Sequence, residues 1–229
     1  FASLFQQQAA EYKALCFQAY NLAKMKIDQA TSNNRAKPLA IITDIDETVL
    51  DNSIYAAHRA LQGKDYDATS WSAYTDMGIA DTVPGAYHFL RYAASQVVDV
   101  FYITNREEDE RAGTLKNLQK FGFPDADEAH LLTKQGTSGK EPRRQSVSTS
   151  HEIALLLGDN LSDFNFLFDK KSVEDRLTAT NGVAAAFGRK FIVLPNPVYG
   201  DWESALYRYN YTLTPAEKDS VLKSQLKGY

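Results

Sequence analysis

The chain has 229 residues, 44% of them hydrophobic, and a formal net charge of −4. That length allows one sizeable hydrophobic core and is short for two full domains. The 25 Lys and Arg residues form no long basic tract and no apolar run approaches the roughly 18 residues of a membrane span, which argues against a nucleic-acid polymer as partner and against a transmembrane segment.

The first predicted element is a long amphipathic helix over residues 3–30, uninterrupted by Gly or Pro. Its Cys16 is the only cysteine, which excludes an intrachain disulfide, and its apolar neighbours predict a buried side chain. Residues 32–34 break the helical pattern, and an apolar run at 39–42 predicts the first strand. Residues 51–83 mix polar and aromatic side chains in short helical stretches, which indicates an insertion.

The rest of the chain alternates between helical and strand-like patterns. We predict, in order, a helix opened by Pro84, a strand at 97–103, a helix at 106–121, a short strand at 130–133, a polar loop at 134–144 leading into a helix, a strand at 154–158, a last strand at 191–194, and a helical, peripheral final segment of about thirty residues.

Strands that alternate with helices predict an α/β fold with a parallel, Rossmann-like sheet. We expect a single unit with a small, mainly helical insertion and helical N- and C-terminal segments. The core would comprise about 36–50 and 84–200, and the helical part about 1–35, 51–83 and 201–229.

Two pairs of carboxylates follow predicted buried strands. Asp44 and Asp46, two residues apart, can point to the same side at the end of the first strand, and Asp159 and Asp163 follow the strand at 154–158. Carboxyl ends of parallel strands meet in the crevice where α/β proteins bind ligands. Two carboxylates a few ångströms apart repel by roughly 4 kcal/mol at an effective dielectric constant of about 20. The pair therefore favours a cation, a shared proton or a cationic substrate group, and Mg²⁺ fits these oxygen ligands best.

Other polar groups are expected at the same crevice. Thr104, Asn105 and Arg106 end the second strand, and Lys140 lies in the loop before the helix that precedes the fourth strand. Together these groups suit phosphoryl transfer: one carboxylate attacks phosphorus, Asp46 acts as general acid and base, and Thr104 and Lys140 hold the phosphate oxygens. Lys134 is an alternative to Lys140.

Each of these residues also has an ordinary structural interpretation. Asp44 or Asp46 can cap the following segment, Thr104 can end a strand, Lys140 can be a solvated lysine, and Asp163 can lie in the first turn of a helix. The combination in this order is far more specific than its parts.

The combination resembles a known family. The chain resembles the haloacid dehalogenase superfamily of phosphatases in four motifs. These are Asp44-x-Asp46-x-Thr48, Thr104, Lys140 and Gly158-Asp159-x-x-x-Asp163. Five further segments resemble class C bacterial acid phosphatases, in particular their lipoprotein-type 5′-nucleotidases. These segments are Glu11-Tyr12, Gln18-Ala19-Tyr20-Asn21, Asp51-Asn52-Ser53, Lys140-Glu141-Pro142-Arg143-Arg144 and Pro197-Val198-Tyr199-Gly200-Asp201-Trp202-Glu203.

The resemblance implies roles for individual residues. Asp44 would be the nucleophile and Asp46 the general acid and base; Mg²⁺ would be held by the Asp44 carboxylate, the Asp46 backbone carbonyl and Asp159, with Asp163 nearby; Thr104 and Lys140 would bind the phosphoryl group, with Asn105 beside them. The implied activity is hydrolysis of nucleoside 5′-monophosphates, nicotinamide mononucleotide among them, and of other phosphomonoesters.

The aromatic residues Trp71 and Tyr199 are the candidates to stack on a nucleotide base, with Tyr74 and Tyr55 as further candidates; core packing is the alternative for each. The long first helix and the aromatic C-terminal segment offer surface for a homodimer.

The resemblance also implies export to the bacterial periplasm or outer membrane, with a signal peptide and a lipid anchor upstream of Phe1; Cys16 does not match the anchoring cysteine. Two other functions stay open: a phosphotransferase of the same superfamily, or a surface ligand-binding protein on an idle phosphatase fold.

Overall fold

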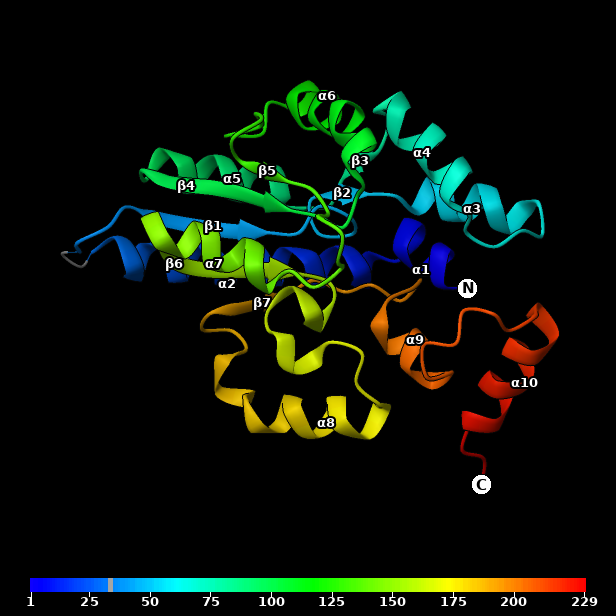
Figure 1. Cartoon of the computed structure of the whole chain (residues 1–229). Coiled ribbons are helices and arrows are strands. Elements are labelled where there is room, and N and C mark those ends of the chain that lie inside the picture. Colours follow the sequence, from blue (N-terminus) through cyan, green and yellow to red (C-terminus); the bar gives the residue numbers. More distant parts are fainter. Residues whose placement is uncertain (33–34) are drawn as a thin grey trace.

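The computed structural model describes residues 1–32 and 35–229; residues 33 and 34, within the predicted break, lie outside the described residues. Its centre is a five-stranded sheet in the order β5-β4-β1-β6-β7, in which every neighbouring pair is parallel (Figure 1). The strands are β1 (Leu39–Thr43), β4 (Val98–Ile103), β5 (Leu131–Leu132), β6 (Glu152–Gly158) and β7 (Phe191–Val193). The predicted α/β fold with a parallel sheet is confirmed.

The helices cover both faces of this sheet and extend beyond it. They are α1 (Ala2–Gln8), α2 (Ala10–Thr31), α3 (Ser53–Leu61), α4 (Ala68–Met77), α5 (Ala86–Ser95), α6 (Arg111–Phe121), α7 (Glu141–Ser150), α8 (Val173–Gly182), α9 (Asp201–Leu206) and α10 (Pro215–Gln225). Short 3-10 turns lie at η1 (Glu108–Glu110), η2 (Leu161–Asp163), η3 (Phe166–Phe168) and η4 (Ala184–Ala186).

The central strand β1 is buried on both faces. Leu39 and Ile41 point into the main core with α2 and α5, whereas Ala40 and Ile42 point into a second core that includes Val147 of α7. Alternate residues of a strand face opposite sides, so a strand between two helical layers must be apolar at every position. This explains the continuous apolar run from which the strand was predicted.

The strand order reverses at β1. From β1 the chain adds β4 and β5 on one side, then crosses to add β6 and β7 on the other. Such a reversal leaves a crevice at the carboxyl ends of the central strands, because the following loops diverge. Asp44 follows β1 and Asp159 follows β6, so both aspartates lie at this point.

The predicted long first helix is wrong in one respect. At Ala9 the backbone is extended, with φ −79° and ψ 124°, so the helix is divided into α1 and α2. The side chain of Gln6 is buried and donates a hydrogen bond to Asp51 at 2.9 Å. Docking of α1 against the insertion thus overrides a local sequence that favours helix.

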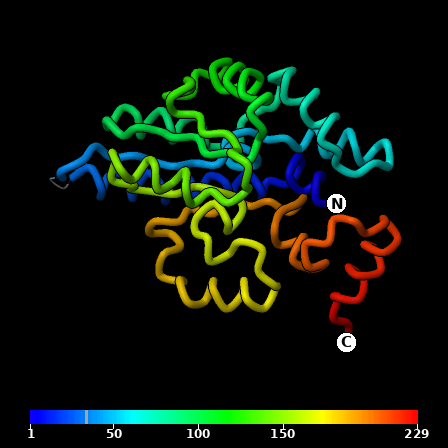
Figure 2. Tube along the Cα trace, in the orientation of Figure 1, coloured from blue at the N-terminus to red at the C-terminus, as the bar shows by residue number. Residues whose placement is uncertain are grey.

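The insertion holds the predicted short helices, α3 and α4, and one feature that was not predicted. Strands β2 (Leu50–Asp51) and β3 (Asp81–Thr82) pair in antiparallel fashion and close the insertion at its base. Figure 2 shows α10 at the periphery, as expected. The division into a core and a helical part stays a prediction.

Cys16 is fully buried, as predicted. Among the described residues, we find no helix with the length and apolarity that a membrane crossing requires.

Candidate active site

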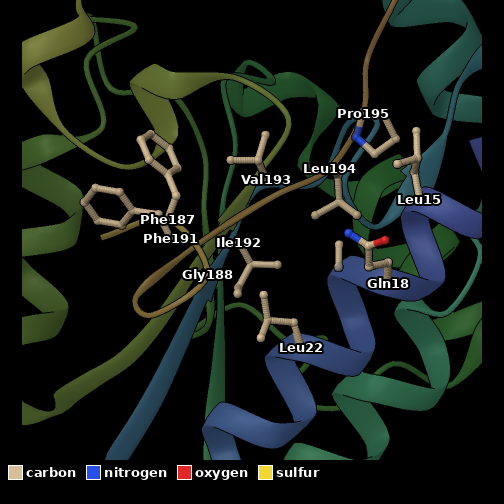
Figure 3. A pocket seen from close by; sticks show the side chains of 11 residues that line it. Leu15, Gln18, Leu22, Phe187, Gly188, Phe191, Ile192, Val193, Leu194 and Pro195 are labelled. Carbon is tan, nitrogen blue, oxygen red and sulfur yellow. The ribbon is translucent and has the colours of Figure 1, made fainter. Parts of the chain in front are cut away.

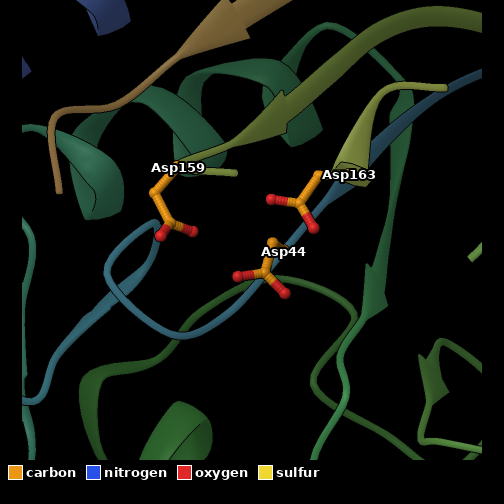
Figure 4. Close-up of side chains that lie close together, drawn as sticks. All are labelled: Asp44, Asp159 and Asp163. Carbon is orange, nitrogen blue, oxygen red and sulfur yellow. The ribbon is translucent and has the colours of Figure 1, made fainter. Parts of the chain in front are cut away.

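Three carboxylates meet at the carboxyl ends of β1 and β6. Asp44, Asp159 and Asp163 each offer an oxygen, and these oxygens lie within 4.8 Å of one another (Figure 4). Mg²⁺ at about 2.1 Å from each ligand places ligand oxygens up to about 4.2 Å apart, so a small inward shift would complete a site. The acidic cluster is therefore placed to bind a divalent metal ion.

Lys140 lies in the middle of these acids. Its side chain is 5% exposed, and its ammonium contacts Asp44 and lies 2.6 Å from an oxygen of Asp163. Lys134, the alternative, instead pairs with Glu107 nearer the surface. One ammonium among three carboxylates leaves a net charge of about −2 when all are ionised, which is what a divalent cation neutralises.

A glycine makes the close approach of Asp163 possible. Gly158 ends β6, and a Cβ added there would lie 2.4 Å from a carboxylate oxygen of Asp163. Asp163 also accepts the backbone N–H of Asn160 at 3.0 Å, which closes the turn η2. The capping interpretation of Asp163 and its place in the cluster therefore both hold.

Asp159 is fixed by two hydrogen bonds from distant segments. Thr48, in the loop after β1, donates to one carboxylate oxygen at 3.3 Å, and Asn196, which follows β7, donates to the other at 2.8 Å. Segments from three strand ends thus determine where this carboxylate points.

Asp46 does not join the cluster of three. Its carboxylate forms an ion pair with Arg106, with 2.7 Å between Nη2 and Oδ1, and accepts the side-chain amide of Asn52 at 2.9 Å. Arg106 is 2% exposed and its Nη1 also donates to Thr114 at 3.0 Å. The two aspartates of the first motif therefore have different partners, and that both point into one crevice stays a prediction.

Thr104 and Asn105 form the next wall of the site. The Thr104 side chain is fully buried and its hydroxyl accepts the backbone N–H of Arg106 at 3.1 Å. Asn105 is exposed, and its amide oxygen accepts from Arg143 of α7 at 2.8 Å. The hydroxyl proton of Thr104 and the amide N–H groups of Asn105 remain as donors for an anion.

Burial governs the pKa values of the carboxyl groups. Burial raises the pKa of Asp44 to about 7, with nearby Asp163 and Asp46 adding to the rise and Lys140 opposing it. Burial, together with Asp163 and Asp44, raises the pKa of Asp159 well above its ordinary value. Burial thus disfavours the ionised form of both carboxyl groups, and a bound cation would offset that cost.

The rings of the insertion pack against one another. Tyr55 and Tyr74 are each only 8% exposed, so they belong to the core of the insertion. Trp71 is half-buried at the edge of this cluster, with its ring 5.0 Å from that of Tyr55 and 6.1 Å from that of the exposed Tyr66. Of the insertion residues that were predicted to stack on a base, only Trp71 presents a partly open ring.

Tyr199 is tied to the loop after β1. The residue is 40% exposed, but its hydroxyl donates to the buried carboxylate of Glu47. Glu47 has a left-handed φ of 58° and also accepts the backbone N–H of Asn52 at 2.8 Å. Burial raises the pKa of Glu47 to about 8, with the Asp46 charge as the next cause.

Sequence reasoning did not assign Glu47, Asn52 or Asn196 to the site, and it gave Arg106, at the end of the second strand, no role. Asn52 falls inside a motif that carried the family resemblance, and Arg106 directly follows the Thr104-Asn105 pair. Asn52 contacts Asp46 and Glu47, only six and five residues away. Arg106, by contrast, lies 60 residues from Asp46, and Tyr199 lies 152 residues from Glu47. Local patterns therefore contained little signal for these contacts.

A separate groove is apolar. It lies between α2 and the edge strand β7. Leu15, Gln18 and Leu22 line one side, and Phe187, Phe191 and residues 192–195 line the other (Figure 3). Its lining residues include no charged side chain, so it is not suited to bind phosphate.

Comparison with known proteins places this geometry in context. Residues 2–202 match the family model described as HAD superfamily, subfamily IIIB (acid phosphatase). The class C acid phosphatase of Bacillus anthracis is 45% identical, with a TM-score of 0.96 over 100% of this chain and 96% of that one. A second structure of that enzyme, with tungstate bound, gives the same identity, coverage and TM-score.

Two curated plant proteins are more distant. Acid phosphatase 1 of Solanum lycopersicum is 24% identical over 69% of this chain, and the stem 31 kDa glycoprotein of Glycine max is 26% identical over 53% of it. The chain spans about half the length of these relatives, 57% and 50% respectively.

Proposed function

Because this chain belongs to subfamily IIIB of the HAD superfamily, a family of acid phosphatases, we propose that it hydrolyses nucleoside 5′-monophosphates and other phosphomonoesters with Mg²⁺ as cofactor and a phosphorylated aspartate as intermediate. Family membership and the phosphatase class agree with the expectation from sequence. The metal, the substrate and the intermediate are the new parts of the proposal.

The observation that carries the proposal is the buried group of Asp44, Asp159, Asp163 and Lys140. Three carboxylates and one ammonium at the switch point suit a divalent cation and a phosphate dianion bound side by side. Asp44, Asp159 and Asp163, with the backbone carbonyl of Asp46, would hold Mg²⁺, which when bound neutralises charge on the carboxylates and on the phosphate oxygens.

The chain's own residues then divide the reaction into two steps. A carboxylate oxygen of Asp44 attacks phosphorus and the bond to the ester oxygen breaks, while Asp46 gives its proton to that leaving oxygen. In the second step Asp46 takes a proton from water, which attacks the phosphorylated Asp44 and releases phosphate. Thr104 and Lys140 hold the phosphoryl oxygens, with Asn105 at the margin.

The proposed base-binding residues are Trp71 and Tyr199. Both rings are partly open and each is connected to Asp46, Trp71 through Arg106 and Tyr199 through Glu47 and Asn52. Stacking of a base on aromatic rings contributes roughly 1 to 3 kcal/mol. The Bacillus anthracis relative binds tungstate, a tetrahedral oxyanion with the shape of phosphate, which supports an oxyanion site in this chain as well.

The test is release of inorganic phosphate from nucleoside 5′-monophosphates, nicotinamide mononucleotide, sugar phosphates and nitrophenyl phosphate, with Mg²⁺ and with EDTA. We expect release that depends on the metal and is fastest for nucleotides. Added alcohols test for phosphotransfer, since a transferase would form new phosphate esters in place of phosphate. Folded, metal-loaded protein that releases no phosphate and makes no ester would favour a ligand-binding protein.

Replacement of the proposed general acid has a selective effect. Asp46→Asn is expected to lower kcat by about 100-fold or more for phenyl phosphate and nucleotides, and much less for nitrophenyl phosphate, because only poor leaving groups need a proton. Steady-state kinetics on this set provide the measurement. Equal losses on phenyl and nitrophenyl phosphates would argue against the assignment.

Removal of the proposed stacking ring should affect binding. Trp71→Ala is expected to raise KM for nucleoside monophosphates by about tenfold, the equivalent of the stacking energy, and to leave KM for glycerol phosphate unchanged. The matched control is Tyr211→Ala, which removes a ring of the C-terminal segment that is 67% exposed. An unchanged nucleotide KM in Trp71→Ala would remove this ring from the proposal.

Metal affinity should depend on pH in a definite direction. The pKa of Asp44 is raised to about 7 in the metal-free protein, so below that pH a binding cation must displace its proton. The Kd for Mg²⁺ is therefore expected to fall by about tenfold per pH unit for each released proton as pH rises toward about 7. Calorimetry in buffers of different ionisation enthalpy counts the protons that are released when Mg²⁺ binds. The Asp44→Asn variant should release one proton fewer than wild type.

A further inference from the structure

Arg106 is a buried cation to which the proposed reaction gives no role. It follows β4, its side chain is 1% exposed, and it contacts neither Asp44 nor the other two members of the acidic cluster at hydrogen-bond distance among the interactions of the described residues. Instead its guanidinium serves three neighbours: the carboxylate of Asp46, the hydroxyl of Thr114 at 3.0 Å, and the ring face of Trp71 at 5.5 Å.

The two oxygens of Asp46 are held differently. Oδ1 accepts from Arg106 Nη2 at 2.7 Å, from Arg106 Nε at 3.1 Å and from the Asn52 amide at 2.9 Å. Within the described residues, Oδ2 accepts only the Nε contact, at 3.2 Å. A carboxyl oxygen with three donors has no lone pair left, so Oδ2 is the oxygen that a proton or a substrate can reach.

The Trp71 contact links this carboxylate to the proposed base site. Asp67 caps α4 by accepting the backbone N–H of Ser70, which fixes the turn that carries Trp71. A planar guanidinium can stack on an aromatic face and still donate in its own plane to a carboxylate. Arg106 lies over the Trp71 ring and also donates to the Asp46 carboxylate. A lysine would supply the positive charge but could not make both contacts through one planar group.

We propose that Arg106 is a positioning residue: it holds Oδ1 of Asp46, leaves Oδ2 to exchange the proton with the leaving oxygen, and joins that carboxyl group to the ring of Trp71. This inference rests on the proposed function. In the first step the Oδ2–H bond breaks and its proton passes to the ester oxygen as the P–O bond breaks. Arg106 keeps all its protons throughout.

Arg106→Lys is the informative variant, because it keeps the charge and loses the planar, forked geometry. Its kcat is expected to fall by about 30-fold or more on phenyl phosphate and nucleoside monophosphates, and by no more than about threefold on nitrophenyl phosphate. Its KM is expected to rise about tenfold for nucleoside monophosphates and to stay unchanged for glycerol phosphate. Arg111→Lys, which alters an arginine paired with Glu108 on the neighbouring helix, is the matched control.

Two outcomes would overturn the proposal. Equal loss of kcat on all leaving groups, with a lowered melting temperature, would mean that Arg106 only stabilises the fold. Wild-type kinetics in Arg106→Lys would mean that the ion pair has no part in the reaction.

A binding measurement separates failure of this inference from failure of the proposed function. Wild-type phosphate release alone decides whether the protein is a nucleotide phosphatase. In an Asp44→Asn background, equilibrium dialysis with a nucleoside monophosphate and Mg²⁺ should show about tenfold weaker binding when Arg106→Lys is added. Unchanged nucleotide binding in the double variant would refute the proposed link between Arg106 and the Trp71 ring. This conclusion does not depend on the rate at which wild type releases phosphate.

Discussion

Asp44→Asn is expected to lower phosphate release from every phosphomonoester by at least about 10⁴-fold, since removal of a covalent nucleophile has effects of that order or larger. An amide in place of the carboxylate has neither the charge nor the basicity to attack phosphorus. The loss should be the same for good and poor leaving groups, because the phosphorylated intermediate precedes hydrolysis for all of them. Initial rates at saturating Mg²⁺ provide the measurement.

The fold of this variant should be intact. Burial raises the pKa of Asp44 to about 7, so above that pH its ionised form is unfavourable in the metal-free protein, and a neutral amide removes this cost. The melting temperature of the metal-free variant at pH 8 should therefore equal or exceed that of wild type. Asp99→Asn, which alters an aspartate paired with His151 on the sheet, is the control for a remote carboxylate. Turnover of Asp44→Asn within about tenfold of wild type would contradict the nucleophile assignment.

The main parts of the fold and of the acidic cluster could be predicted because they depend on local patterns. A central parallel strand is apolar at every position, so 39–42 and 154–158 were recognisable, and the acids that follow them must meet at one edge of the sheet. Lys140 was placed by its position in the loop before the helix that precedes the fourth strand, and by its resemblance to a family motif. Lys134 could be set aside only when its ion pair with Glu107 was seen.

Other features could not be predicted because their causes are far away in the sequence. Nothing near Ala9 disfavours helix; the helix is interrupted where α1 docks Gln6 against Asp51. The separate partners of Asp44 and Asp46 could not be predicted for a similar reason: Arg106, which pairs with the Asp46 carboxylate, lies sixty residues beyond it in the sequence. Composition and spacing do not reveal which of 25 basic residues will be buried.

The arrangement of contacts suggests how substrate binding and chemistry are combined. Oδ1 of Asp46 accepts hydrogen bonds from both Arg106 and Asn52. Arg106 in turn contacts Trp71, and Asn52 is linked through Glu47 to Tyr199. The proposed acid is thus held by the same residues that hold the two proposed stacking rings. A nucleotide base bound by those rings would restrict the position of the Asp46 carboxyl group, which must reach the ester oxygen of the same nucleotide.

Lys140 is the residue for which we expect the second-largest effect. Lys140→Met should lower kcat/KM by about 10³-fold for all phosphomonoesters at saturating Mg²⁺, because a buried ammonium that faces the phosphate oxygens is lost from a site with little water. The methionine chain fills similar space without the charge. Kinetics on phenyl, nitrophenyl and nucleotide substrates should give nearly equal losses, unlike the selective loss that we expect for Asp46→Asn.

Metal binding separates this electrostatic role from a structural one. The ammonium contacts Asp44 and Asp163, so its removal takes away the cation that lies against these carboxylates. Mg²⁺ should then bind as tightly as in wild type or more tightly above pH 7. Asp159→Asn, the matched change within the same cluster, should instead weaken Mg²⁺ binding. If excess Mg²⁺ restored the activity of Lys140→Met, the lysine would act only by arranging the metal ligands, and direct contact with the phosphoryl group would be refuted.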